Sequence, residues 1–318
     1  MISANKRRTE STFCSHVRTH EAVVTNEFWY GDGHPSLGKT FTAKKTTERH
    51  AAVVHILLKA GKRAEKAKDK LLAETYHDLA DKLDGCKPCA RCGSLACPKC
   101  ARAFQKAKVA AQETLILHLR NAGTGATANI AANITANITA IATNITAIAT
   151  KRLVMANVVP LWMTFAPAQL HQLDIQKRNR WLKDALAREG FDRVMFGSAD
   201  LSWENGFYQL HWHIGMFASN RKKLKERLKK IFPGKKGQYD RPVLISKTWS
   251  LGFLAYKNKA IKLPDLLRRN RKHLAELLLV LDRTEPLDLM VLTKLRLSAQ
   301  EGHLILRPIE NKSQKSLR

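Results

Sequence analysis

His211 and His213 are the residues whose chemistry the sequence marks most clearly. They stand two positions apart in a run of alternating polar and apolar residues, so a β-strand would present both imidazoles on one face. Two imidazole nitrogens together with a carboxylate oxygen suit Mg²⁺, Mn²⁺ or Zn²⁺. Because a bare His-x-His more often faces solvent or makes structural hydrogen bonds, the metal-site interpretation depends on an acidic residue on the same face.

The dipeptide Asn205-Gly206 predicts where that acidic residue lies. Between two alternating runs it is the strongest short-range hairpin signal, because both central residues of a type I′ turn need a positive φ. Counting outward from the turn places Asp200 opposite His211, on the face that carries both histidines. We therefore expect Asp200, His211 and His213 to bind a divalent metal. Three ligands from one hairpin leave coordination positions open for a substrate.

A second metal-binding pattern is the group of five cysteines at residues 86–100. Their Cys-x-x-Cys spacings among Gly and Pro are typical of knuckles that present thiolates to a tetrahedral ion, and in a cytosolic chain they favour a structural Zn²⁺ over disulfides. Cys97 and Cys100 form the second knuckle. The first is either Cys86 with Cys89 or Cys89 with Cys92, and of these we predict Cys86 and Cys89.

The composition indicates a polyanionic partner. The chain of 318 residues carries 55 Lys and Arg against 27 Asp and Glu, a formal net charge of +28, and nucleic acid is the usual partner of so basic a protein. Its 44% hydrophobic residues exclude a disordered tail and suffice for one large or two ordinary domains. No apolar run reaches the roughly 20 residues of a transmembrane helix, and no signal-peptide core follows the first residues. We expect a cytoplasmic protein without a membrane partner.

The hairpin belongs to a predicted core domain at residues 151–263. Alternating residues predict strands at 158–165, 193–203 and 207–217, and an amphipathic pattern predicts a helix at 175–188. The order strand, helix, strand, strand fits an α+β fold, an antiparallel sheet with helices packed on one face.

A strongly basic helix is predicted directly after the hairpin, at residues 221–232, with seven Lys or Arg and one Glu. Each Lys or Arg that neutralises a phosphate releases counterions, so this helix is a candidate grip on a nucleic-acid backbone. A merely solvated face is the alternative. The candidate DNA-binding residues are Arg221, Lys222, Lys225 and Lys229.

Two predicted segments precede the core domain on the N-terminal side. Residues 1–44 form a polar arm, and residues 45–120 form a helical region that contains the cysteine knuckle at 86–100. Within this region, helical spacing extends over residues 46–83, with a break expected at Gly61.

Two further segments adjoin the core domain. Residues 121–150 repeat Asn-Ile-Thr-Ala units without charge or aromatic side chain, which we interpret as a low-complexity linker or insertion. Residues 264–318 are predicted as helices to about Leu297, a final strand at 302–309 and a basic tail.

Tyr256 and Lys259 lie in a segment of helical spacing, where residues i and i+3 share a face. A tyrosine hydroxyl can attack phosphorus if a metal polarises the phosphate and a cation stabilises the developing charge. Taken alone, a Tyr-x-x-Lys pair is usually a surface pair or a packed tyrosine, so it gains weight only from the other motifs. Tyr239 is the alternative nucleophile.

Three motifs stand in a fixed order: Leu-Trp-Met-Thr-Phe at 161–165, His211-Trp-His213, and Tyr256-Lys-Asn-Lys259. This order resembles the HUH endonucleases, and the preceding cysteine knuckle makes residues 86–262 most similar to plasmid rolling-circle replication initiators (Rep proteins). The resemblance implies a His pair that binds Mg²⁺ or Mn²⁺ with an acidic or polar third ligand. It also implies a tyrosine that nicks one DNA strand, stays joined to the 5′ phosphate and leaves a 3′ hydroxyl for a polymerase.

The resemblance assigns a role to each motif, with two departures from the family. The first motif lacks a second Thr, and the single Tyr of the third motif argues against a two-tyrosine mechanism. The implied roles are metal binding by His211 and His213, nucleophilic attack by Tyr256 with Lys259 as its basic companion, and a third metal ligand at Asp200, with Glu204 and Gln209 as alternatives.

The sequence therefore predicts a plasmid replication initiator that nicks an origin strand by metal-dependent transesterification. Its partners would be DNA, a polymerase and a host helicase, because no helicase-type Gly-x-x-x-x-Gly-Lys-Ser/Thr occurs. Two alternatives stay open. A transposase or mobilisation relaxase of the same superfamily would use the same chemistry, and a non-catalytic zinc-containing DNA-binding regulator would never form a covalent adduct.

Overall fold

The computed structural model describes most of the predicted core domain and of the helical region before it. Residues 1–41 of the predicted arm and the Asn-Ile-Thr-Ala repeat lie outside the described residues, as do Cys89, Tyr239, Tyr256 and Lys259. The described residues are 42–87, 90–121, 152–191, 195–234, 242–246, 254, 258, 273–300 and 303–309.

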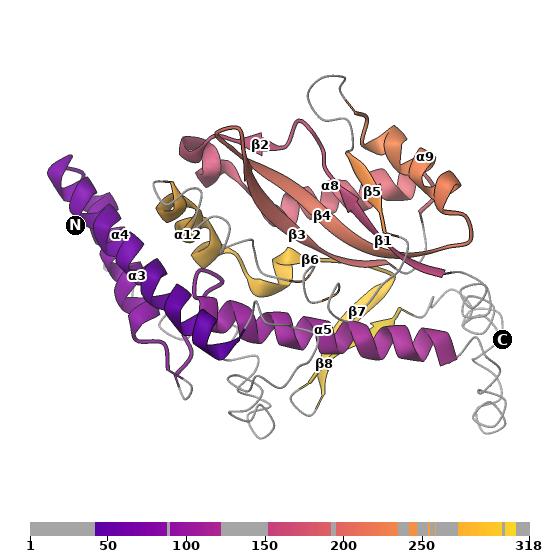
Figure 1. Ribbon diagram of the computed structural model, residues 1–318, viewed down its shortest axis with the longest axis horizontal. Helices are drawn as coiled ribbons and strands as arrows, with labels where there is room; N and C mark the ends of the chain where they lie inside the picture. Colours follow the sequence, from indigo (N-terminus) through magenta and orange to yellow (C-terminus); the bar gives the residue numbers. More distant parts are fainter. Residues whose placement is uncertain are drawn as a thin grey trace, which may run out of the picture.

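Two long strands, β3 (Met195–Glu204) and β4 (Phe207–Ala218), form the centre of the main sheet (Figure 1). The Asn205-Gly206 turn between them has a positive φ at both residues, 51° and 86°, as a type I′ turn requires. The register places Asp200 opposite His211. The hairpin and its register, both predicted from the turn dipeptide, are confirmed.

The hairpin lies within a six-stranded antiparallel sheet of order β5-β1-β4-β3-β6, in which β2 pairs with the end of β4 that is closest to the turn. Together with the helices, this sheet confirms the predicted α+β class. The strands that complete it are β1 (Arg152–Val158), β2 (Thr164–Phe165), β5 (Val243–Ile245) and β6 (Met290–Thr293).

The strand predicted at 158–165 is two strands, β1 and β2, with a turn between them. Pro160 has no N–H to donate to a sheet, and its carbonyl oxygen accepts a turn hydrogen bond from the Met163 N–H at 3.0 Å. After this turn and β2, the chain forms the short helix η3 (Pro167–Gln172). The strand that borders β4 over most of its length therefore begins six residues earlier than predicted, at Arg152.

The C-terminal region contributes strands where the sequence predicted helices. After α12 (Leu274–Arg283) and the short helix η4 (Pro286–Leu289), β6 pairs with β3 as an edge strand of the sheet. A proline at the start of η4 cannot continue the preceding helix. A separate hairpin follows, formed by β7 (Leu295–Gln300) and β8 (His303–Pro308), the second of which matches the predicted strand.

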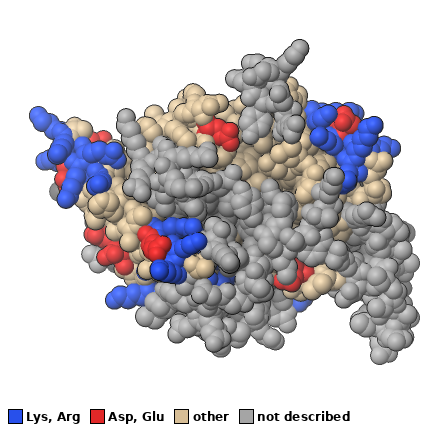
Figure 2. All heavy atoms as spheres, viewed as in Figure 1, with Lys and Arg blue, Asp and Glu red and all other residues tan. Residues whose placement is uncertain are grey.

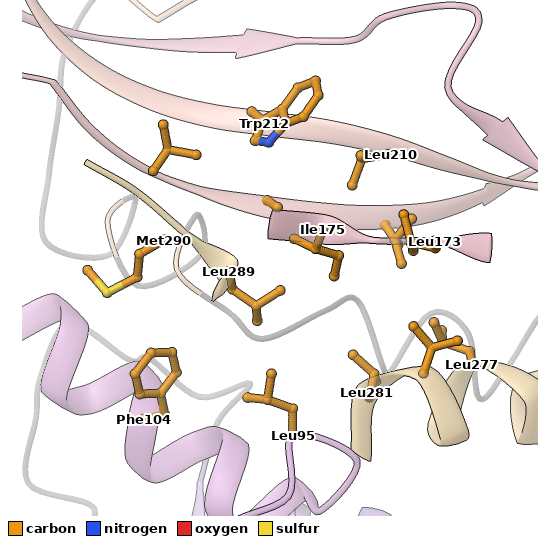
Figure 3. Packing of buried hydrophobic residues seen from close by; sticks show 14 of the residues in the cluster. Leu95, Phe104, Leu173, Ile175, Leu210, Trp212, Leu277, Leu281, Leu289 and Met290 are labelled. Atoms are coloured by element: carbon orange, nitrogen blue, oxygen red, sulfur yellow. The ribbon is translucent and has the colours of Figure 1, made fainter. Parts of the chain in front are cut away.

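α8 (Ile175–Arg188) covers the apolar face of the sheet, and its bounds match the predicted helix. The Trp212 indole of β4 donates from Nε1 to Asn179 Oδ1 at 2.6 Å and stacks on Trp181. α9 (Arg221–Ile231) packs beside α8. The core continues from the sheet towards the N-terminal helices, since Trp212, Leu289 of η4, Leu281 of α12 and Phe104 belong to one cluster of buried hydrophobic residues, part of which Figure 3 shows.

α3 (Ala43–Lys66) and α4 (Lys70–Asp84) form a helical pair at one end of the molecule (Figure 1). The chain turns at Lys68, which has a φ of 63°, and not at Gly61 as predicted. Gly61 lies inside α3, where an added Cβ would come within 2.6 Å of the His77 ring. Gly61 therefore lies in close contact with the His77 side chain of α4 and does not break the helix.

α5 (Pro98–Asn121) runs below the sheet in the view of Figure 1 and reaches the face opposite to α8. The Lys108 ammonium donates to Ser198 Oγ of β3 at 3.0 Å, and Ser198 pairs with His213 on the histidine face. α8 of the core domain and α5 of the preceding helical region therefore contact opposite faces of the sheet. None of the helices among the described residues combines the length and hydropathy needed to span a bilayer.

Candidate metal centres

Asp200, His211 and His213 form a compact buried group on one face of the β3–β4 hairpin. The Asp200 Oδ2 atom lies 3.3 Å from His211 Nε2 and 3.4 Å from His213 Nε2. The three side chains are at most 6% exposed. Both imidazoles therefore direct the same nitrogen at the same carboxylate oxygen.

These distances fit three ligands of one ion. All three ligand atoms lie within 4.8 Å of one another. With metal–nitrogen and metal–oxygen bonds of about 2.1 Å, two ligands at tetrahedral or octahedral angles are roughly 3.0 to 3.4 Å apart. The group can thus close around a single ion with small shifts, and its mixed nitrogen and oxygen donors suit several divalent metals.

Backbone contacts orient the carboxylate and select it over the alternative third ligands. Asp200 Oδ1 accepts the Leu201 N–H at 2.9 Å, which leaves Oδ2 for the imidazoles. The Gln209 amide nitrogen donates to the Pro160, Met163 and Leu210 oxygens, so the backbone holds this side chain. Glu204 is exposed at the hairpin turn. Glu204 therefore lies outside the group that Asp200 forms with the two histidines.

Gly197 allows the strands to approach beside His213. An added Cβ at Gly197 would lie 2.4 Å from the His213 backbone oxygen, far below any allowed contact. A larger residue would push β3 away from β4 next to the metal group, so this glycine supports the geometry without contributing a ligand.

Asn157 is a candidate ligand that the sequence analysis missed. It pairs with His213 from the neighbouring strand β1, so the two side chains share a face. Its Oδ1 atom is buried and has no hydrogen-bond partner among the described residues. An amide oxygen is a ligand that hard cations accept. The sequence analysis did not place Asn157 in a strand, because the predicted strand began at residue 158.

Lys108 is a second residue that the sequence did not indicate. Its side chain is fully buried, with Nζ 3.0 Å from Ser198 Oγ and 4.9 Å from the centre of the Phe104 ring. Burial lowers the pKa of Lys108 to about 7, and the Asp200 charge only partly opposes this. In sequence it is one of many lysines on a helix, and only the fold brings it to the histidine face.

Cys86, Cys92, Cys97 and Cys100 form the second group, with Cys100 Sγ 3.6 Å from both Cys86 Sγ and Cys92 Sγ. Four thiolates around Zn²⁺ with bonds of about 2.3 Å are roughly 3.8 Å apart, so the spacing fits a tetrahedral site. Both predicted pairings used Cys89, which lies outside the described residues. Among the described cysteines, a loop brings Cys92 to Cys100 beside Cys86.

The four thiols perturb one another strongly. Hydrogen bonds from Cys100 and its neighbours hold the pKa of Cys86 far below its ordinary value, whereas burial raises the pKa of Cys97. Buried thiols in contact cannot all ionise without a cation to balance their charges. The donor set and its burial therefore fit a structural zinc ion, which would stabilise every thiolate at once.

The basic helix α9 presents its predicted DNA-binding residues at the surface. Arg221, Lys222 and Lys229 are exposed and Lys225 is partly exposed. Figure 2 shows the Lys and Arg side chains gathered over α9. Lys229 also lies 3.2 Å from Glu226, an exposed pair of small energetic weight.

Two anchors flank the predicted nucleophile. Leu254 and Asn258 are buried, and the Asn258 N–H donates to the Leu254 oxygen at 2.9 Å, an i to i+4 bond of helical type. The Asn258 side chain pairs with Gln112 of α5.

Comparisons with protein-family models, curated proteins and solved structures find no match to this chain.

Proposed function

We propose that this protein nicks one strand of DNA by metal-dependent transesterification, as a plasmid rolling-circle replication initiator of the HUH type. The observation that carries the proposal is the convergence of the two imidazole Nε2 atoms on Asp200 Oδ2. A buried group of this kind, in a chain of net charge +28, suits a metal-assisted reaction on a phosphodiester.

Asp200, His211 and His213 would hold Mg²⁺ or Mn²⁺, with the Asn157 oxygen alongside. The bound ion would polarise the scissile phosphate and leave it open to attack. The hairpin contributes the rest of the geometry, since the short Asn205-Gly206 turn fixes the register that brings the acid to the imidazoles.

Tyr256 is the proposed nucleophile. Its phenolic oxygen would form a bond to phosphorus as the bond to the 3′ oxygen breaks. The phenolic proton leaves to solvent or a nearby base, and the departing 3′ oxygen takes up a proton. The product is a 5′-phosphotyrosine ester and a free 3′ hydroxyl, and Lys259 would balance the charge that develops. Because the ester keeps the energy of the broken bond, a later 3′ hydroxyl can reverse the attack.

Two other regions would support this reaction. Arg221, Lys222, Lys225 and Lys229 of α9 would contact DNA phosphates, which makes binding weaken steeply with salt. The four-cysteine group would hold a structural Zn²⁺. A host helicase and a polymerase would complete replication.

The test is incubation of the full chain with labelled single-stranded oligonucleotides and Mn²⁺, followed by a denaturing gel. We expect a metal-dependent covalent band that is lost in His211→Ala and His213→Ala. Tight DNA binding without any covalent band would instead support a non-catalytic zinc-containing regulator. A band with transposon-end or transfer-origin substrates alone would identify a transposase or a relaxase of the same chemistry.

A further inference from the structure

The cysteine region and the Asp200-His211-His213 group are connected by one helix, α5. Its first residue, Pro98, lies between Cys97 and Cys100, so the cysteine group anchors its start. Ten residues further on, Lys108 donates to Ser198 Oγ at 3.0 Å on the histidine face. The helix therefore runs from one candidate metal centre to the other.

One turn beyond Lys108, Gln112 makes a second tertiary contact from the same side of the helix, as residues i and i+4 do. Gln112 Nε2 donates to Asn258 Oδ1 at 3.0 Å, and Asn258 Nδ2 donates to Gln112 Oε1 at 2.6 Å. Gln112 is fully buried and Asn258 is 2% exposed. Asn258 Nδ2 also donates to the Leu254 oxygen at 3.0 Å, so Gln112, Asn258 and Leu254 are linked by hydrogen bonds.

A reciprocal buried amide pair is a specific restraint. Each partner satisfies the other, and removal of either leaves a buried polar group unpaired. In sequence, Tyr256 stands two residues from both Leu254 and Asn258.

We propose that Lys108 and Gln112 are positioning residues, through which α5 holds Leu254 and Asn258 in place relative to the Asp200-His211-His213 group. Lys108 fixes the helix to β3 beside His213, and Gln112 fixes Asn258 to the helix. The cysteine group holds the start of the same helix. It would therefore also help to position α5 beside the Asp200-His211-His213 group. This inference rests on the proposed function for its catalytic consequence but not for its structural one.

The structural consequence is tested by hydrogen exchange across residues 254–258. We expect Gln112→Leu to speed exchange there by at least about tenfold, because each 1.4 kcal/mol of lost pairing is tenfold in an opening equilibrium. Lys108→Met should do the same to a smaller extent. The matched control is Lys62→Met on the exposed face of α3, which should leave this exchange unchanged.

The catalytic consequence is tested by adduct formation and Mn²⁺ affinity measured on the same variants. A misplacement of a reacting group by about 1 Å can reduce a rate by up to roughly 10²-fold. Gln112→Leu should therefore slow adduct formation at least tenfold, while its Mn²⁺ affinity stays near that of the wild type. The exchanged pair Gln112→Asn with Asn258→Gln keeps two facing amides and should recover part of the rate.

Three results would overturn the inference. They are unchanged exchange at 254–258 in Gln112→Leu, an unchanged adduct rate, or a parallel loss of Mn²⁺ affinity, which would place the effect in the metal site itself. If Gln112→Leu does not fold, the exchanged pair decides through the same measurements. If the wild type forms no adduct, the proposed function fails, while hydrogen exchange still supports or overturns the link through α5.

Discussion

The carboxylate Oδ2 of Asp200 lies 3.3 Å from Nε2 of His211, across a hairpin whose register pairs these two residues. The other carboxylate oxygen accepts a backbone N–H, so only one oxygen faces the imidazoles. A buried acid held in this way between two imidazoles has the geometry of a metal ligand.

Asp200→Asn should weaken Mn²⁺ binding by at least about 100-fold, because it removes the only negative charge of the three-residue group. The matched control is Glu204→Gln, a change of the exposed acid at the end of the same strand, which should bind Mn²⁺ as the wild type does. Isothermal titration or Mn²⁺ electron paramagnetic resonance measures both. Equal losses in the two variants would remove Asp200 from the site.

Asn157→Asp should tighten Mn²⁺ binding, and Asn157→Leu should weaken it by about tenfold, because the Asn157 oxygen shares a face with His213 and lacks another partner among the described residues. Asn205→Asp at the hairpin turn is the matched control, since Asp also suits a type I′ turn. If Asn157→Asp and Asn205→Asp alter the affinity equally, the effect comes from net charge and Asn157 is no ligand.

Cys92→Ser should lower the bound zinc of the purified protein well below one per chain, whereas Cys89→Ser should retain it. The reason is that Cys92 Sγ lies 3.6 Å from Cys100 Sγ within the four-sulfur group. Metal analysis by mass spectrometry measures the zinc content of both variants. The reverse pattern would restore the pairing predicted from the Cys-x-x-Cys spacing.

Lys108 should make the free energy of unfolding depend on pH. Its pKa falls from 10.5 to about 7 on folding, so between these values the unfolded chain binds more protons than the folded one. The free energy of unfolding therefore rises with pH through this window, by up to about 1.4 kcal/mol per pH unit. Below pH 7 the buried lysine destabilises the folded protein most.

Urea unfolding of wild type and Lys108→Met at pH 7, 8 and 9 isolates this effect, because the other titrating groups contribute to both proteins. The difference in unfolding free energy, wild type minus variant, should increase with pH. A constant difference would mean that Lys108 has an ordinary pKa in the folded protein.

Local patterns predicted the parts of the fold that local chemistry determines. The Asn205-Gly206 turn fixed the hairpin register because both residues adopt a positive φ, and that register alone places Asp200 opposite His211. α8 spans the residues predicted from its amphipathic pattern, with the Asp174 side chain capping its start and Gly190, at a positive φ, following its end. These features need only residues that are close in sequence.

The rest of the site depends on contacts between distant segments. Asn157 and Lys108 reach the histidine face through sheet order and through the packing of α5, which no periodicity encodes. The path of the loop brings Cys92 to the other sulfurs, and the Cys-x-x-Cys spacing alone does not determine which sulfurs meet. Gly61 was predicted to break a helix, but its contact with α4 is visible only once the two helices are packed.

The proposed reaction joins DNA covalently to Tyr256. It is tested most directly by mass spectrometry of the protease-digested adduct from wild type, Tyr256→Phe and Tyr239→Phe after incubation with a single-stranded oligonucleotide and Mn²⁺. We expect a nucleotide attached to the peptide that contains Tyr256, absent in Tyr256→Phe and retained in Tyr239→Phe. A protein that binds the oligonucleotide tightly but carries no nucleotide on any tyrosine would contradict it.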